Sequence, residues 1–276
     1  MNPILSRWHK SLGKDAGKEG DPMLKRISVP LLFEPGTSWE YGYNLEWAGL
    51  LIMRLNNMSL EAYMQKYIWD PLGIKNITFH LELKPEVRKN LVRMTKRGNA
   101  AMRGMAAPND DKVQWTDERL YEDPIADEFG GAGGIGSAKE YLKILHSISA
   151  DDGKLLMSET IDEMFTPQLG EGAQKAFSGF SSFLDESEMF SAHEIGTKVD
   201  YGLGGGLILS DKSTGVRSGT LTWSGLPNLL WTIDRESGLS LLYASNIVPF
   251  GDHKSRKFQQ LFEKEMYTLY GRASKL

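Results

Sequence analysis

Four short apolar runs in the last third of the chain, separated by turns, constrain the fold most. Each run has the length of a strand, and residues that favour turns follow, as at Asp211–Gly215 and Asp234–Gly238. The runs are Leu207–Leu209, Ser218–Trp223, Leu229–Asp234 and Leu239–Ala244. The pattern predicts an antiparallel meander, because connections this short join strands that run in opposite directions. A final helix should follow, with apolar residues on one face at Phe258, Leu261, Phe262, Met266 and Leu269.

Helical periodicity dominates the part of the chain before these runs. Trp47–Leu55 is apolar around most of a helix, which predicts a buried helix. Ser59 is a good N-cap residue for the helix that follows, Ser137–Glu140 has the pattern of a capping box, and Ser158 should cap a further helix. The apolar stripe after Ser59 consists of Leu60, Tyr63, Met64, Tyr67 and Ile68. Helices, then consecutive strands, then a helix indicate the α+β class.

We expect a single domain over residues 1–276, because a chain of this length can bury a full core. A mainly helical lobe should cover about residues 1–165, and the antiparallel strands with the C-terminal helix about residues 200–276. Residues 82–128 are charged and interrupted by prolines, which predicts an irregular insertion near the lip of a cleft. Residues 170–200 are rich in Gly, Ser and Phe, which predicts a long loop.

Composition excludes several classes of function. The net charge of −4 and the pI near 5.8 argue against a nucleic-acid surface, which carries a basic patch. The chain has no cysteine, so disulfides, thiolate catalysis and cysteine-ligated zinc are excluded. The first residues lack the apolar core of a signal peptide, and no run has the length of a membrane helix. We therefore expect a cytoplasmic protein with neither nucleic-acid nor membrane partners.

The segment Phe33–Asn44 places a tyrosine at the junction between a loop and a helix. Pro35 and Gly36 favour a turn, because proline presets φ and glycine tolerates a positive φ. Tyr41 follows directly before the apolar helical stretch. A tyrosine held there can transfer a proton if a cation or hydrogen-bond donor lowers its pKa from about 10. The position also suits a tyrosine that packs its ring and keeps its hydroxyl in water.

Eight motifs in order give this tyrosine a wider context. They are PGTSWEY (35–41), YNLEWAGLL (43–51), MSLEAYMQKYIWDPLGI (58–74), NITF (76–79), GGAGGIGSAKEYLKIL (130–145), LMSETIDEMFTPQL (156–169), YGLGGG (201–206) and WSGLPNLLW (223–231). Together they resemble the serine β-lactamase-related family of β-lactamases, esterases and fungal acyltransferases. The resemblance implies a β-lactamase/transpeptidase-like fold, with an antiparallel sheet flanked by helices beside a mainly helical lobe. It corresponds to the C-terminal two-thirds of that family, so the fold is expected to be N-terminally truncated.

The resemblance implies acyl transfer from a small ester or thioester, and it implies roles for particular residues. Tyr41 matches the catalytic tyrosine that works beside a nucleophilic Ser-x-x-Lys pair. The third family motif matches Trp223, Ser224, Gly225 and Leu226, which would line the acyl group, with the N–H of Leu226 in the oxyanion hole. Trp223 stands where β-lactamases have lysine, which favours neutral substrates over carboxylate-bearing ones. The other substrate-binding residues that the resemblance implies are Tyr43 and Asn44.

The nucleophile is the part of this chemistry that the sequence does not provide. The one Ser-x-x-Lys is Ser11–Lys14, whereas the reaction needs a serine that starts a buried helix and a desolvated lysine one turn later. Lys10, Gly13 and Asp15 around it would leave the lysine solvated, and Tyr41 follows much sooner than in the family. We therefore expect no catalysis from these residues alone.

Three hypotheses remain open. The chain is the C-terminal part of an active esterase or acyltransferase, or a non-catalytic binding or regulatory protein, or one half of a complex whose partner supplies the Ser-x-x-Lys helix. In the family the missing segment contributes edge strands and the nucleophile helix, so we expect apolar surface to be exposed without it. That surface would cause aggregation or require a partner chain to cover the exposed edge.

Other chemistries find less support in the sequence. Gly131–Gly136 has the pattern G-x-G-x-x-G, but the residues before it are acidic and interrupted by proline, so they do not predict the strand that a dinucleotide site needs. We interpret this stretch as a glycine loop that feeds a helix beside the active site. No Gly-x-Ser-x-Gly occurs, which argues against a nucleophile-elbow hydrolase. The five histidines show no metal-binding spacing, so we expect neither a metal nor a cofactor.

Overall fold

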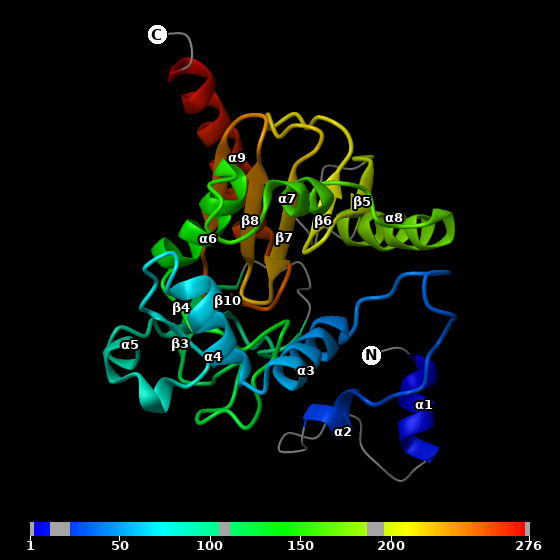
Figure 1. The fold of residues 1–276 in the computed structure, drawn as a ribbon, viewed down its shortest axis with the longest axis vertical. Helices are drawn as coiled ribbons and strands as arrows, with labels where there is room; N and C mark the ends of the chain where they lie inside the picture. Colours follow the sequence, from blue (N-terminus) through cyan, green and yellow to red (C-terminus); the bar gives the residue numbers. More distant parts are fainter. Residues whose placement is uncertain (1–2, 12–22, 105–110, 187–195, 274–276) are drawn as a thin grey trace.

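A computed structural model describes residues 3–11, 23–104, 111–186 and 196–273. The C-terminal part forms a five-stranded antiparallel sheet in the order β5-β6-β7-β8-β9 (Figure 1). The strands are β5 (Val199–Tyr201), β6 (Gly206–Ile208), β7 (Leu221–Gly225), β8 (Leu229–Asp234) and β9 (Leu239–Tyr243). Strands that are neighbours in sequence are neighbours in the sheet, so the predicted meander is confirmed, and β5 adds a strand to the predicted set.

Helices cover this sheet. In Figure 1, α9 (His253–Ala273) lies behind the sheet, while α6 (Ala138–Ala150) and α7 (Ser158–Met164) lie in front of it. The sheet contacts α6 at β8 and β9, α8 (Glu171–Glu186) at β5, and α9 at β9. A buried apolar cluster lies where α8 meets β5 and β6, and its members are Phe177, Val199, Ile208 and Val216. An antiparallel sheet flanked by helices is the predicted α+β architecture.

The C-terminal helix packs polar residues against the body of the protein, which contradicts the predicted apolar face. The helix itself is confirmed as α9, but three of its apolar residues are more than half exposed: Phe258, Leu261 and Leu269. Three polar positions at intervals of four are buried instead: Ser255, Gln259 and Glu263. Gln259 donates a hydrogen bond to the Asn228 carbonyl at 2.7 Å, and Glu263 pairs with Lys212 at 2.9 Å. These bonds compensate the desolvation of the polar groups.

The helix predicted at Trp47–Leu55 is confirmed as α3 (Asn44–Asn56), but the prediction of its burial is wrong. Glu46 and Gly49 are its buried residues. Four of its large apolar side chains are exposed: Leu45 (53%), Trp47 (45%), Leu51 (57%) and Leu55 (75%). Apolar content makes a helix suitable for burial, but burial also requires another element on that face, and the described part of the chain leaves these side chains uncovered.

The N-cap predicted at Ser59 is confirmed. Its hydroxyl accepts a hydrogen bond from the N–H of Ala62 at 3.1 Å, which satisfies a free donor at the start of α4 (Leu60–Met64). The helix continues as the π-helical turn η1 (Gln65–Trp69), so it ends before Pro71 as predicted. Leu60 is fully buried at the start of the apolar stripe, whereas Tyr67 near its end is 43% exposed. Trp69, which lies outside the predicted stripe, is buried.

Residues 82–128 contain more regular structure than the sequence predicts. They include the end of η2 (Leu81–Leu83), then α5 (Pro85–Lys89), β2 (Met94–Arg97) and β3 (Val113–Thr116). Strand β2 pairs antiparallel with β3 and parallel with β10 (Ile247–Val248), so this region is joined to the C-terminal part. A buried ion pair between Arg97 and Asp252 strengthens the same connection. The prediction of an irregular insertion is therefore wrong for these stretches.

The capping predictions for α6 and α7 need correction. Ser137 precedes α6, but its side chain makes no capping hydrogen bond. The Glu140 carboxylate instead accepts hydrogen bonds from the backbone N–H groups of Lys75 and Asn76, at 3.0 and 2.5 Å. Ser158 is the first residue of α7 rather than its cap, and its hydroxyl donates a hydrogen bond to Asp151. Both helices exist as predicted, with different bonds at their beginnings.

The loop predicted over residues 170–200 is wrong for most of that range, because Glu171–Glu186 forms the helix α8. Ala173 and Phe177 are buried, and Phe180 is partly buried beside β8 and continues the same helical stripe. The abundance of Gly and Ser in this stretch concealed that stripe. Residues 187–195 lie outside the described part of the chain.

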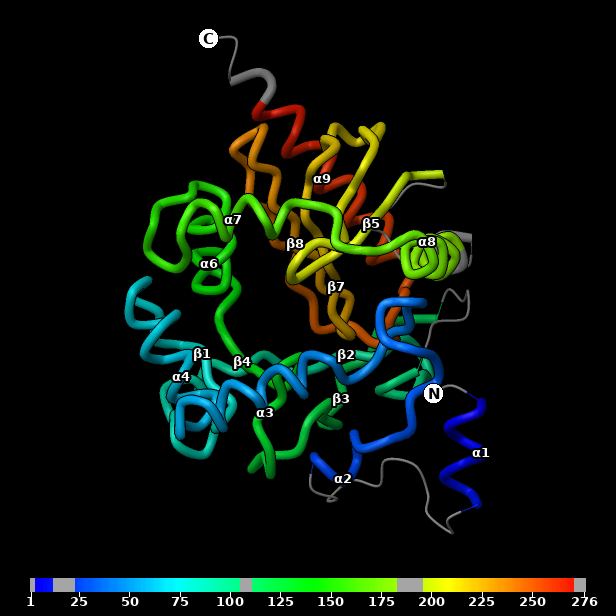
Figure 2. Tube along the Cα trace, turned by 45° about the vertical axis from the view of Figure 1, so that its right-hand side comes forward, coloured from blue at the N-terminus to red at the C-terminus, as the bar shows by residue number. Residues whose placement is uncertain are grey.

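The remaining elements are short. They are α1 (Pro3–Ser11), α2 (Met23–Ile27), β1 (Ile77–Thr78) and β4 (Ile135–Gly136), and β1 pairs antiparallel with β4. Helix α1 lies away from the five-stranded sheet in both Figure 1 and Figure 2. None of the described helices has the length and apolarity that crossing a lipid bilayer requires.

Candidate active site

The loop that carries Tyr41 is held by a turn and by an aromatic anchor. The N–H of Thr37 donates a hydrogen bond to the Glu34 carbonyl at 3.1 Å, and Gly36 has φ +84°, as a type II turn requires at its third residue. The ring of Trp39 then packs on Phe177 and Phe180 of α8, with centroids 4.9 and 5.0 Å away. This anchor fixes the chain two residues before Tyr41.

Tyr41 and Trp223 meet, although 182 residues separate them. Their rings are stacked, with centroids 6.3 Å apart and an interplanar angle of 7°. Tyr201 of β5 packs edge-on against Trp223 at 5.3 Å. Figures 1 and 2 both place the end of β7 beside the beginning of α3. The structure therefore brings together the tyrosine and the third motif that the sequence singled out.

The surroundings of Tyr41 keep its phenol protonated. Although the residue is 65% exposed, partial burial of the side chain raises its pKa, and the acidic groups of Glu46 and Tyr121 raise that pKa further. Burial, with a contribution from Tyr41, raises the pKa of Tyr201 to about 12. A phenol in this setting donates hydrogen bonds at neutral pH. Service as a base would require a cation next to the hydroxyl.

The third motif extends past the end of its neighbouring strand. The β6–β7 pairing ends at Gly206↔Thr222, whereas the β7–β8 pairing continues to Gly225↔Leu229. Trp223 and Ser224 are half-buried in this extension, and Leu226 begins the turn that follows. A strand segment of this kind suits the backbone contact with an acyl group that the motif implies. The oxyanion role of Leu226 stays a prediction.

Asn228 anchors the turn after this motif, and the sequence analysis did not identify it. Asn228 is 5% exposed and has a left-handed backbone, with φ +56°. Its side-chain amide donates to the carbonyls of Ile247 and Pro249 at 2.8 and 2.9 Å, and its oxygen accepts from the N–H groups of Gly251 and Asp252. The Pro227-Asn228 dipeptide was the available signal, because asparagine tolerates this conformation and bonds to nearby backbone.

The glycine loop that includes Gly130 and Gly131 packs against the beginning of α3. A methyl group at Gly130 would lie 2.0 Å from the Leu45 carbonyl oxygen, and one at Gly131 would lie 3.0 Å from the Glu46 carboxylate. Only glycine permits such an approach at position 130. Glu46 itself is 7% exposed. The loop before α6 thus lies against the helix that follows Tyr41, as the sequence interpretation of a close-approach loop requires.

Tyr43 and Asn44 lie at the start of α3, and both are exposed. Tyr43 occupies the N-cap position without a capping side-chain bond, and its carbonyl accepts the N–H of Trp47 at 3.1 Å. Asn44 is the first helical residue. Their proximity to Tyr41 follows from the sequence, and their role in substrate binding stays a prediction.

Ser11 has none of the features of a nucleophile in this structure. It is the last residue of α1 rather than the first residue of a buried helix. It is exposed, and its hydroxyl donates to the Trp8 carbonyl at 2.7 Å. Lys14 lies outside the described residues. The local geometry agrees with the sequence argument against this pair.

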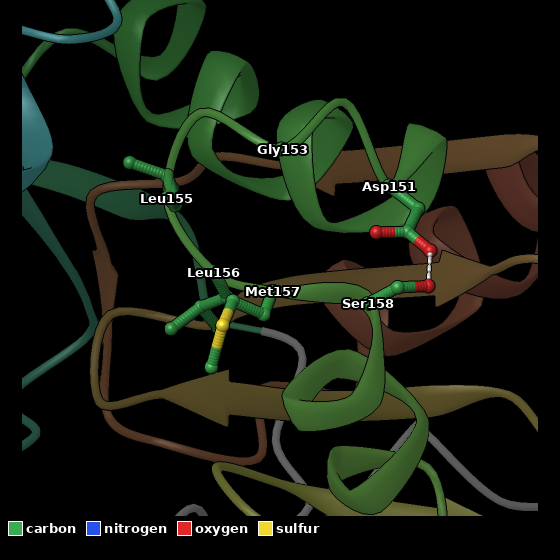
Figure 3. A pocket seen from close by; sticks show the side chains of 6 residues that line it. All are labelled: Asp151, Gly153, Leu155, Leu156, Met157 and Ser158. Atoms are coloured by element: carbon green, nitrogen blue, oxygen red, sulfur yellow. Dashed lines mark hydrogen bonds between the residues drawn. The ribbon is translucent and has the colours of Figure 1, made fainter.

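A surface hollow lies between α6 and α7 and includes none of the residues that the resemblance assigns to the acyl-transfer site (Figure 3). Its lining residues are Asp151, Gly153, Leu155, Leu156, Met157 and Ser158. Asp151 and Ser158 hydrogen-bond to each other across it. The hollow therefore offers no additional group to the site at Tyr41.

The chain matches the β-lactamase family over residues 10–264. It is 30% identical over 272 residues to the monacolin J acid methylbutanoyltransferase of Aspergillus terreus, which covers 98% of this chain and 63% of that protein. It is 32% identical over 271 residues to the ML-236A carboxylate methylbutanoyltransferase of Penicillium citrinum, with coverage of 97% and 62%. A lovastatin esterase of Penicillium rubens is 30% identical over 272 residues, with coverage of 98% and 66%.

The solved structures agree. A mutant of simvastatin synthase from Aspergillus terreus superposes with a TM-score of 0.85 at 30% identity, over 99% of this chain and 62% of that chain. The chain thus spans less than two-thirds of the length of these relatives. The match in both sequence and fold means that the chain belongs to the β-lactamase family.

Proposed function

We propose that these 276 residues form the acyl-binding side of a serine-dependent acyl-transfer site that acts on small esters or thioesters. In this proposal Tyr41 transfers a proton, and Trp223 to Leu226 line the acyl group. A serine that these 276 residues do not supply attacks the carbonyl, and backbone N–H groups hold the oxyanion of the tetrahedral intermediate. The intermediate then collapses to an acyl-serine as the ester or thioester bond breaks, and the alcohol or thiol of the substrate leaves with a proton. Water or an alcohol then attacks the acyl-serine, takes the acyl group and frees the serine. Relatives named as methylbutanoyltransferases and as an esterase support this reaction class.

The stacked contact between Tyr41 and Trp223 is the observation that carries the proposal. Two motifs that the family resemblance assigns to one site come from opposite ends of the chain and lie 6.3 Å apart, ring to ring. The tryptophan presents an apolar surface where a cationic lysine would attract a carboxylate. That environment supports a neutral acyl substrate.

The electrostatics of Tyr41 support the further proposal that these residues alone are catalytically incompetent. Its raised pKa has burial and two acidic neighbours as causes, so the phenol does not become a base without an added cation. A Ser-x-x-Lys pair would bring both the nucleophile and that cation. Ser11 supplies neither, because its hydroxyl is bonded to its own helix.

Hydrolysis of a short-chain p-nitrophenyl ester by the purified 276-residue chain tests this incompetence. The wild type, Tyr41→Phe and Ser11→Ala should all equal the buffer blank. Turnover that Ser11→Ala abolishes would show that Ser11 is the nucleophile after all. Turnover that only Tyr41→Phe abolishes would show that another nucleophile lies within the chain.

The exposed apolar side chains of α3 support the proposal that a further polypeptide segment or partner chain covers this helix. Leu51 and Leu55 are 57% and 75% exposed on one helix. Sedimentation velocity on the purified chain should show association that depends on concentration. Replacement of both leucines by glutamine should reduce it, and a monodisperse wild-type monomer would contradict the proposal.

The non-catalytic alternative, a binding or regulatory protein, uses the same residues without turnover. It is favoured by the geometry of Ser11 and by the protonated state of Tyr41. Supplying a Ser-x-x-Lys segment distinguishes the two functions, because only an acyl-transfer site should then gain turnover.

A further inference from the structure

Three potential metal ligands converge beside the glycine loop, from segments that are far apart in the sequence. Glu61 lies in α4, His80 directly precedes η2, and Glu128 precedes the loop that supports α3. One donor atom from each lies within 4.8 Å of the other two. His80 Nε2 is 2.9 Å from Glu128 Oε1. All three side chains of this cluster are partly buried.

The other nitrogen of His80 has its own carboxylate. Nδ1 lies 2.9 Å from Glu82 Oε1, which leaves Nε2 facing Glu61 and Glu128. A metal-bound histidine typically donates its second ring N–H to a carboxylate, which fixes the tautomer and the orientation of the ring. Glu82 holds this position at His80, because it lies at Nδ1 while Nε2 faces Glu61 and Glu128.

Backbone hydrogen bonds hold the two carboxylates in place. Glu61 accepts from the N–H of Phe79 at 2.6 Å and from the Thr78 hydroxyl at 2.8 Å. Glu128 Oε2 accepts from the N–H of Glu61 at 2.8 Å, so its Oε1 remains directed at His80. A carboxylate has about four lone-pair positions, so each side chain retains the capacity to bind a cation.

The carboxylates of this cluster outnumber the cationic groups near them, of which Arg88 acts on Glu82. Three carboxylates, those of Glu61, Glu82 and Glu128, surround one imidazole. Within the described residues no lysine or arginine forms a salt bridge with any of the three. Partly buried negative charge of this kind is costly unless a cation accompanies it. A divalent ion would supply that charge.

The donor set selects the kind of ion. Carboxylate oxygens alone would suit Mg²⁺ or Ca²⁺, whereas imidazole favours first-row transition metals. In a tetrahedral zinc site with bonds of about 2.0–2.2 Å, the donor atoms lie about 3.3 Å apart. Here His80 Nε2 and Glu128 Oε1 lie 2.9 Å apart, and the donor atoms of all three residues lie within 4.8 Å of one another. Three protein ligands would leave a fourth position for water.

We propose that Glu61, His80 and Glu128 bind a zinc ion. No metal was predicted, because the five histidines show no metal-binding spacing. Positions 61, 80 and 128 are 19 and 48 residues apart, so no short motif contains the three ligands. The ion would link Glu61 in α4 to Glu128, which directly precedes Phe129 and Gly130. The glycine loop packs against α3 directly after Tyr41, so zinc would stiffen the support of that helix. The site is independent of the proposed acyl-transfer reaction.

Zinc titration of the chelator-treated 276-residue chain, by calorimetry and elemental analysis after desalting, tests the site. Wild type should bind one zinc per chain, and its Tm should rise by about 5–10 °C at zinc 100-fold above the Kd. His80→Gln and Glu128→Gln should lose this binding. Glu82→Gln should weaken it by about 10–100-fold, as expected for a group that orients a ligand.

His146→Gln is the matched control, because His146 is exposed on α6. It should bind zinc as the wild type does. The glutamine at position 128 keeps an oxygen for the N–H of Glu61, so that variant retains the backbone bond, and circular dichroism checks its fold. The proposal would be overturned if the desalted wild type contained no more zinc than the buffer blank. Equal zinc affinity in wild type, His80→Gln and Glu128→Gln would also overturn it.

Discussion

Gly130→Ala should destabilise the protein more than a Gly→Ala substitution at any other position of the glycine loop. The new Cβ would lie 2.0 Å from the Leu45 carbonyl oxygen and 2.8 Å from its carbon, whereas ordinary contacts begin at 3.4 Å. The loop and α3 must therefore separate by about 1.4 Å. Both sides of the contact are backbone, so no side chain can rotate to relieve it. Overpacking costs about 1–3 kcal/mol, and we expect the upper half of that range.

Gly134→Ala is the matched control, because it adds the same methyl group four residues later. Its Cβ would meet only Phe79, at 3.9 Å. Urea denaturation should give a loss of about 2–3 kcal/mol for Gly130→Ala and less than about 0.5 kcal/mol for Gly134→Ala. Calorimetry should show a Tm about 4–10 °C lower for Gly130→Ala. Equal stability of the two variants would refute the close approach of the loop to α3.

Three further predictions concern buried polar groups and a helix cap. Lys212 and Glu263 pair at 2.9 Å with side chains 1% and 3% exposed, so Glu263→Ala should cost about 3–5 kcal/mol in urea denaturation. The double replacement Lys212→Met/Glu263→Leu should cost much less, and an equal loss would contradict the role of the pair. Burial raises the pKa of Tyr201 to about 12, with a further contribution from Tyr41. Above pH 10 the unfolded phenol ionises while the folded phenol keeps its proton, so stability should fall by about 2–3 kcal/mol as the pH rises to 12. Tyr201→Phe should show a correspondingly smaller fall in urea midpoints, and unchanged pH dependence would argue against the shift. Ser59→Ala should cost about 1 kcal/mol, whereas Ser137→Ala should cost little because Ser137 makes no capping bond; equal losses would contradict the two assignments.

The strands and most helices were predictable because their signals are local. The turn residues between Leu229–Asp234 and Leu239–Ala244 indicated an antiparallel pair. Strand β8 has the predicted bounds, and β9 ends one residue earlier, at Tyr243. The face of α9 was not predictable from apolar periodicity. Its buried side depends on Lys212, which comes from a loop 51 residues earlier, and an ion pair of that kind leaves no pattern in the helix itself.

The candidate site was likewise predictable from the sequence only in part. Tyr41 and Trp223 were singled out by motifs, and their stacking required only that the family fold be correct. Asn228 was missed because its four hydrogen bonds reach residues 247–252, which the sequence does not connect to it. The cluster of Glu61, His80 and Glu128 was missed for the same reason. Its ligands meet only after α4 and the glycine loop have packed.

The central claim is that Tyr41 belongs to an acyl-transfer site whose nucleophile comes from outside these 276 residues. The most direct measurement joins the chain to the part of the Aspergillus terreus methylbutanoyltransferase that lies outside the match, and follows p-nitrophenyl butyrate hydrolysis. Turnover should appear, fall by about 100-fold or more in Tyr41→Phe, and persist in Tyr270→Phe, an exposed tyrosine of α9. Equal turnover in Tyr41→Phe and Tyr270→Phe would contradict the claim.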